Sequence, residues 1–152
     1  MNEEKRTFTE NEIKKNIEEL FSEIWPEMEG RSIVESNCYK NIDSIVHKFN
    51  QHSDNFDNLL TSLSSLDGLG LVISSGLIFI AYKDLAVPFD KYTTGYALYK
   101  KILYSPKISG GNYTTACSKV RDYIAKHPTI NNIHEFVLTA GSLDPLMATP
   151  PI

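Results

Sequence analysis

The apolar residues of this chain recur at three- and four-residue spacing along most of its length, which is typical of amphipathic helices. Near the N-terminus, Ile13, Ile17 and Leu20 lie on one helical stripe, behind a capping-box pattern that pairs Thr9 with Glu12. Prolines and glycines interrupt the stripes and mark the loops. The pattern predicts helices over about 9–25, 32–49, 55–65, 71–82, 90–104, 112–126 and 130–140.

The helix predicted over 71–82 is apolar nearly all round, so we expect it at the centre of the molecule. Two parts of it, 71–73 and 77–80, are also compatible with short strands. Because no other segment alternates convincingly, the sequence predicts an all-α fold. We expect one compact multi-helix domain over residues 1–152, with an irregular tail over 142–152.

The composition is that of an ordinary globular protein, with 41% apolar residues and a net charge of −4. Residues 1–80 hold seven basic and fourteen acidic side chains, whereas residues 81–152 hold eight basic and five acidic. The acidic total argues against strong non-specific binding of nucleic acid. The basic excess of the second half is compatible either with a solvated lysine surface or with a patch that faces phosphates.

Other composition features exclude several classes of site. No apolar run reaches membrane-spanning length, and the first residues lack a signal-peptide core, so we expect no membrane contact and an intracellular location, in the cytoplasm and nucleoid or in the nucleus. Cys38 and Cys117 are far apart in sequence and are expected to be reduced core thiols. The four histidines are not clustered, so no metal site and no cofactor are predicted.

Residues 63–90 carry the most specific pattern of the chain. Two apolar helical segments are joined through Gly68, Leu69 and Gly70, and a carboxylate, Asp90, follows twenty positions after the second glycine. Glycines expose backbone N–H groups without a Cβ in the way. Next to a helix N-terminus, such amides form a phosphate site that needs no basic side chain.

This order of elements resembles the helix-hairpin-helix DNA glycosylase superfamily of the endonuclease III and MutY type. Residues 66–70 match its hairpin, within a helix-hairpin-helix motif over 55–82, and Asp90 occupies the place of the family's aspartate in the segment 87–104. The resemblance implies that Gly68, Leu69 and Gly70 bind the DNA backbone and that Asp90 is the catalytic residue. It covers about thirty residues, so the chain is an abridged and divergent relative at most.

The chain departs from the family in two features that matter for chemistry: one residue of the hairpin helix and the number of cysteines. Bifunctional members carry a lysine nucleophile two residues after the second glycine, and this chain has Val72 there. The resemblance therefore implies at most a monofunctional glycosylase without lyase activity. An iron–sulfur cluster is not expected, because it needs four cysteine ligands and the chain has two.

Each candidate residue has a simpler structural explanation. Asp90 follows Pro88 and Phe89 and is equally suited to cap a helix. Lys91 is a candidate for a phosphate contact or for an ion pair with Asp84. Tyr92 and Tyr96 are candidates to stack against an extruded base, although such tyrosines more often pack in a core. The two glycines are also compatible with an ordinary turn between helices.

The sequence thus leaves two hypotheses about function. The leading one is a DNA-binding, glycosylase-like protein that binds the DNA backbone through Gly68 and Gly70 and, if active, uses Asp90 to excise a base. The second is a non-catalytic helix-hairpin-helix interaction module that binds DNA structure or a protein partner. The missing lysine, the missing cluster, the short chain and the acidic net charge favour the second.

Overall fold

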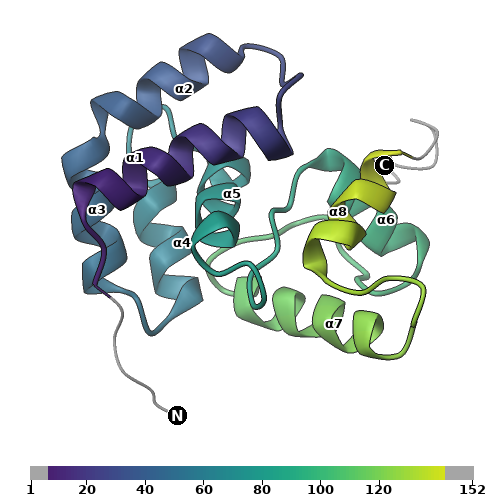
Figure 1. Cartoon of the computed structure of the whole chain (residues 1–152). Helices are drawn as coiled ribbons and strands as arrows, with labels where there is room; N and C mark the ends of the chain where they lie inside the picture. The colour runs from purple at the N-terminus through teal and green to yellow at the C-terminus, as the bar shows by residue number, and fades with distance from the viewer. Residues whose placement is uncertain (1–6, 143–152) are drawn as a thin grey trace.

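The computed structural model describes residues 7–142, and within them it has eight α-helices, one π-helical turn and no strand (Figure 1). The predicted all-α fold is therefore confirmed for this part of the chain; of the predicted irregular tail, only residue 142 is described. The elements are α1 (Glu10–Glu19), the π turn η1 (Leu20–Ile24), α2 (Arg31–Lys40), α3 (Ile42–Gln51), α4 (Phe56–Ser64), α5 (Leu71–Ala81), α6 (Lys91–Tyr99), α7 (Tyr113–Ala125) and α8 (Ile133–Gly141).

The first helix begins and ends with well-defined hydrogen bonds. The predicted capping box is present: Glu12 N–H donates to Thr9 Oγ1 at 3.2 Å, and Thr9 N–H donates to Glu12 Oε1 at 3.0 Å. At the other end the helix widens into η1, which closes with the Trp25 N–H donating to the Leu20 carbonyl at 2.9 Å. Trp25 then leaves the helix with its side chain buried.

The prediction of one helix over 32–49 is wrong, because the chain breaks at Asn41 into α2 and α3. The Asn41 side chain donates to the Asn37 carbonyl at 2.8 Å, which competes with regular helix hydrogen bonding. The same amide group donates to the Asp67 carbonyl at 3.0 Å, a contact with a segment distant in sequence. The predicted start at Ser32 also differs, since α2 follows Gly30 at φ 73 without a side-chain cap.

Helix α6 ends at Tyr99, five residues before the predicted end. The Lys101 N–H donates to the Leu98 carbonyl at 3.0 Å and the Ile102 N–H donates to the Ala97 carbonyl at 2.8 Å, which is the Schellman pattern. Lys101 takes the left-handed conformation, φ 60, that glycine usually supplies at this position. Ile102 and the residue after it are buried, so packing against the core stops the helix where no glycine signals a stop.

The last helix begins later than the predicted residue 130. Asn132 caps α8, with its side-chain oxygen accepting from the Glu135 N–H at 2.9 Å. The sequence places Thr129 three residues earlier, beside Pro128, which also resembles a cap. Ile130 is buried and precedes the helix, so its burial sets the position at which the chain turns.

The helices form two neighbouring groups that share one hydrophobic core (Figure 1). In the first group α5 packs against α1 and α4, and in the second α8 packs against α6 and α7. Contacts between α4 and α7 join the two groups. Every residue of α5 from Ile73 to Ala81 is buried, which confirms the prediction that this helix is central. Among the described helices, none has both the length and the hydropathy needed to cross a membrane.

Candidate functional site

The glycine-containing turn joins α4 to α5 through residues 65–70. The Leu69 N–H closes it by donating to the Leu66 carbonyl at 3.1 Å, and the Leu69 side chain is buried beneath it. Gly68 has φ 81, a conformation that favours glycine, whereas Gly70 is extended with φ −87 and ψ −173. Both glycines are exposed, so the turn lies at the surface.

The junction of α2 and α3 supports this turn from one side. A Cβ on Gly68 would lie 2.5 Å from Asn37 Nδ2, so the absence of a side chain lets Asn37 pack against the backbone. Asn41 holds the neighbouring carbonyl of Asp67. The first glycine is therefore explained by contact with the protein's own α2. Gly68 is positioned by packing, which leaves Gly70 as the more open of the two.

Gly70 is the N-cap of α5, and it has no side chain to accept hydrogen bonds from the helix's first N–H groups. A Cβ at this position would meet nothing within 4 Å. The next two residues, Leu71 and Val72, are 41% and 37% exposed. The first turn of α5 thus presents backbone donors beside an apolar surface, with the exposed carboxylate of Asp67 close in sequence.

Asp90 is a helix cap whose two carboxylate oxygens both accept hydrogen bonds from the chain. Oδ1 accepts from the Thr93 N–H at 2.7 Å, which caps α6. Oδ2 accepts from the Trp25 indole Nε1–H at 2.8 Å. The capping function anticipated from the sequence is thus present, and the tryptophan contact is one that sequence reasoning missed. Nothing in the spacing of residues 25 and 90 indicates that they meet.

A buried segment fixes the position of Asp90 beside α5. The Phe89 N–H donates to Ser75 Oγ at 2.9 Å, and the Tyr113 hydroxyl donates to the Val87 carbonyl at 2.8 Å. Ser75 follows Gly70 by five residues on α5, an axial rise of about 7.5 Å. The tertiary structure therefore places the glycine-containing turn and the aspartate segment along the same helix.

The three other candidates near Asp90 lie in different environments. Lys91 is exposed, with its Nζ 5.1 Å from the centre of the Tyr92 ring. Tyr92 is partly buried. Tyr96 is buried and packs edge-on against Phe136 with ring centres 5.2 Å apart. Burial, with a smaller effect of Tyr123, raises the pKa of Tyr96 to about 12.

Six of the eight basic side chains of the second half either contact another part of the protein or line one recess. Lys83 forms an ion pair with Glu19, and Arg121 donates to the Leu85 carbonyl. Four lysines instead surround a recess between the end of α6 and α7: Lys100, Lys101, Lys119 and Lys126. In the part of the chain that is described, no three potential metal-ligating side chains cluster.

Both cysteines are buried thiols. Burial raises the pKa of Cys38 to about 12 and that of Cys117 to about 11. Cys117 Sγ accepts from the Val87 N–H at 3.3 Å, within the segment that leads to Asp90. A thiol held protonated in this way is a poor nucleophile, so these residues contribute packing and not catalysis.

Comparison with protein-family models, with curated proteins and with solved structures gave no match.

Proposed function

We propose that this protein is a non-catalytic helix-hairpin-helix module that binds the DNA backbone through the first turn of α5. The observation that carries the proposal is the open surface at Gly70. An N-cap without a side chain, at the exposed start of a helix, leaves N–H donors for an external acceptor. The positive end of the helix dipole favours a phosphate at the same place.

The surroundings of the turn support modest affinity. Asp67 places a negative charge near the bound phosphate, and the chain as a whole is acidic. A contact made by backbone amides neutralises few phosphates, so the salt dependence of duplex binding should be shallow. With one or two phosphates neutralised, the slope of log affinity against log salt is about −1 to −2.

The geometry of Asp90 favours a structural role over catalysis. For an aspartate to assist base excision, an oxygen must face the sugar or an attacking water. Here one oxygen caps α6 and the other accepts from the Trp25 indole. Both oxygens thus already serve contacts within the protein, and Val72 replaces the lysine of bifunctional enzymes.

A matched set of substitutions at Gly70 tests the binding site. Asp90 has φ −89 and ψ −177, nearly the backbone conformation of Gly70, so an aspartate fits the N-cap of α5. Gly70→Asp would satisfy the free amides and repel phosphate without loss of helix stability. Gly70→Ala keeps the amides free. We expect Gly70→Asp to weaken duplex binding at least tenfold in fluorescence anisotropy at low salt, with Gly70→Ala within about twofold of wild type.

Equal affinity of Gly70→Asp and the wild-type protein would overturn the proposal. Wild-type protein that fails to bind duplex even at low salt would also overturn it, and would direct attention to the exposed Leu71 and Val72 as a contact for a protein partner. Release of a base from a panel of damaged duplexes by the wild type, and not by Asp90→Asn, would establish the glycosylase hypothesis instead.

A further inference from the structure

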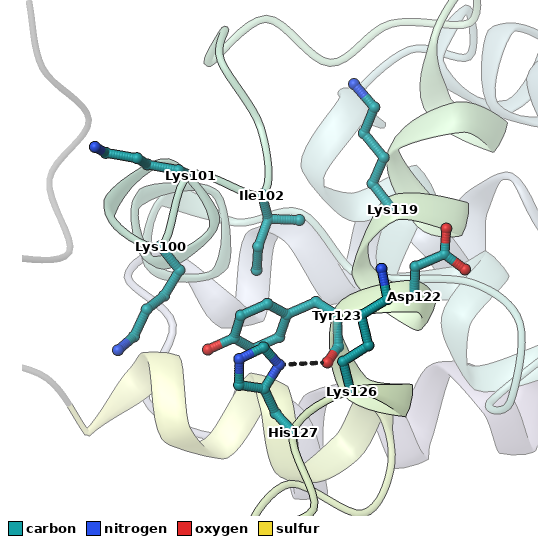
Figure 2. Close-up of a pocket in the computed structure, with 8 residues that line it drawn as sticks. All are labelled: Lys100, Lys101, Ile102, Lys119, Asp122, Tyr123, Lys126 and His127. Atoms are coloured by element: carbon teal, nitrogen blue, oxygen red, sulfur yellow. Dashed lines mark hydrogen bonds between the residues drawn. The ribbon is translucent and has the colours of Figure 1, made fainter.

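The recess between the end of α6 and α7 combines positive charge with aromatic surface (Figure 2). It is open to solvent and has a volume of about 240 Å³. Ile102 lies between the two segments, and four lysines are among the lining residues; the side chains of Lys100 and Lys101 extend away from Ile102 in the view of Figure 2. Asp122 is the one carboxylate among its lining residues, so the wall carries a net charge of +3 with His127 neutral.

The lysines of this recess form no ion pair with a carboxylate in the described part of the chain. Lys100 and Lys126 are C-caps of α6 and α7, where the helix dipole favours a cation. That explanation does not extend to Lys119, which lies in the middle of α7. Lys101 directly follows the C-cap of α6 and takes the left-handed conformation that costs a non-glycine residue about 1 kcal/mol.

The side chains of α7 that line the recess share one face of the helix. Lys119, Asp122, Tyr123 and Lys126 are separated by three, four and seven positions, which places them together at 3.6 residues per turn. The two lysines are separated by about 10.5 Å along the helix axis. They therefore bracket the tyrosine and present two separate positive charges to one ligand.

Aromatic rings accompany the charges. The rings of Tyr123 and His127 are stacked, with centres 3.8 Å apart and planes at 15°, and His127 Nδ1 lies 2.7 Å from the Tyr123 carbonyl oxygen (Figure 2). His127 is exposed. Tyr99 and Tyr104, on either side of the lysine pair in sequence, are 51% and 81% exposed. The Lys100 Nζ lies 5.4 Å from the centre of the Tyr99 ring, so one face of that ring already holds a cation, and the Tyr104 ring is the more open platform for a stacked base.

We propose that this recess, whose lining residues 100–102 are flanked in the chain by Tyr99 and Tyr104, binds single-stranded nucleic acid. Lysines spaced along a groove neutralise successive phosphates, and exposed aromatic rings stack on bases without sequence preference. Four lysines on two elements exceed what a single phosphate requires, which favours a strand over a free nucleotide. The surface is separate from the hairpin, because α7 and α2, which supports the hairpin, lie at opposite ends of the molecule (Figure 1).

The binding test uses a fluorescein-labelled oligothymidine of about fifteen nucleotides and anisotropy at low salt. We expect the double variant Lys119→Gln and Lys126→Gln to bind at least tenfold more weakly than the wild type. Its log–log salt slope should be shallower by about 1.4, which corresponds to two phosphate contacts on a single strand. The control is Lys14→Gln with Lys15→Gln on α1, which removes the same charge from exposed positions away from the recess.

The aromatic contribution is tested separately with Tyr104→Ser, a change at a side chain so exposed that the fold does not depend on it. Loss of one stacked base should weaken oligothymidine binding at least about fivefold and leave the salt slope unchanged. An unchanged affinity would overturn the assignment of stacking to this residue. Together, the two variants separate phosphate contacts from base contacts.

Several results would overturn the proposal. One is an equal loss of affinity in the α1 control. A second is that the wild type does not bind oligothymidine. A third is that thymidine monophosphate competes as tightly as the oligomer. If the α7 double variant lost as much affinity for duplex DNA as for oligothymidine, the proposed ligand of the recess would be a duplex and not a single strand. Gly70→Asp should leave oligothymidine binding unchanged, so failure of the hairpin proposal is distinguishable from failure of this one.

Discussion

The indole Nε1–H of Trp25 donates to Oδ2 of Asp90 over 2.8 Å, and this bond joins the end of η1 to the start of α6. The Trp25 ring also occupies the space beside Gly76, where a Cβ would lie 2.6 Å from Cζ3. A single side chain therefore links the first helix, the central helix and the aspartate. The chemistry available to Asp90 depends on this contact, because it engages the oxygen that the N-cap leaves free.

Substitution of Asp90 should change stability more than any activity. Asp90→Ala removes a cap and leaves the indole N–H without its acceptor, so the free energy of unfolding should fall by about 2 kcal/mol. Asp90→Asn keeps the shape and one acceptor oxygen, so it can retain one of the two hydrogen bonds and should cost less. Urea denaturation, monitored through Trp25 fluorescence, measures the free energy of unfolding of both variants. A stable Asp90→Ala protein with an unshifted emission spectrum would contradict the structural role.

The close approach of Trp25 to α5 predicts intolerance of a side chain at Gly76. Gly76→Ala should destabilise the protein by about 1–3 kcal/mol, because the added methyl group overlaps a rigid ring in a packed core. Gly141→Ala, at the end of α8 with nothing within 4 Å of the new Cβ, is the matched control. It should leave stability equal or slightly raised. Thermal unfolding by circular dichroism compares the pair.

Gly68 is required for two reasons, its left-handed backbone and the close approach of Asn37, and a comparison with Gly30 separates them. Gly68→Ala should cost about 2 kcal/mol, because it combines left-handed backbone strain with overlap of Asn37. Gly30 has φ 73 and open space around its Cβ position, so Gly30→Ala should cost about 1 kcal/mol from the backbone alone. Chemical denaturation of both variants gives the difference between their losses in free energy of unfolding. Equal costs would show that Asn37 moves aside freely.

A lysine in the left-handed conformation predicts a stabilising change. Lys101→Gly should raise the free energy of unfolding by up to about 1 kcal/mol, because glycine takes φ 60 without the Cβ penalty. The Schellman hydrogen bonds to Ala97 and Leu98 remain available. A rise in the thermal midpoint measures the effect. A lower midpoint would mean that the lysine side chain itself stabilises the turn.

The buried thiols predict loss of stability at alkaline pH. The folded pKa values of Cys38 and Cys117, about 12 and about 11, lie above their ordinary 9.0. The unfolded chain therefore loses these protons first, and stability should fall as pH rises from 9 through 11 to 12. Burial also raises the pKa of Tyr113, which acts in the same direction. Denaturation midpoints between pH 8 and 11 measure the decline, and Cys117→Ser with Cys38→Ala should reduce its steepness.

Local pattern determined most of the helices. The three-to-four spacing of apolar residues and caps such as Thr9 and Asp90 placed seven helical segments, since these signals act within a few residues of chain. Helix ends were less predictable. The break at Asn41 depends on the carbonyl of Asp67, and the end of α6 depends on burial of Ile102; both are contacts with distant residues.

The sequence by itself determined an all-helical chain with a two-glycine turn and an aspartate twenty residues later. Only the tertiary structure decided what these residues contact. It placed Asn37 against Gly68 and Trp25 on Asp90, and it gathered lysines from α6 and α7 around one recess. The physical reason is range: helix propensity and capping act over one or two turns, whereas a side chain's chemistry is set by neighbours that only folding brings near.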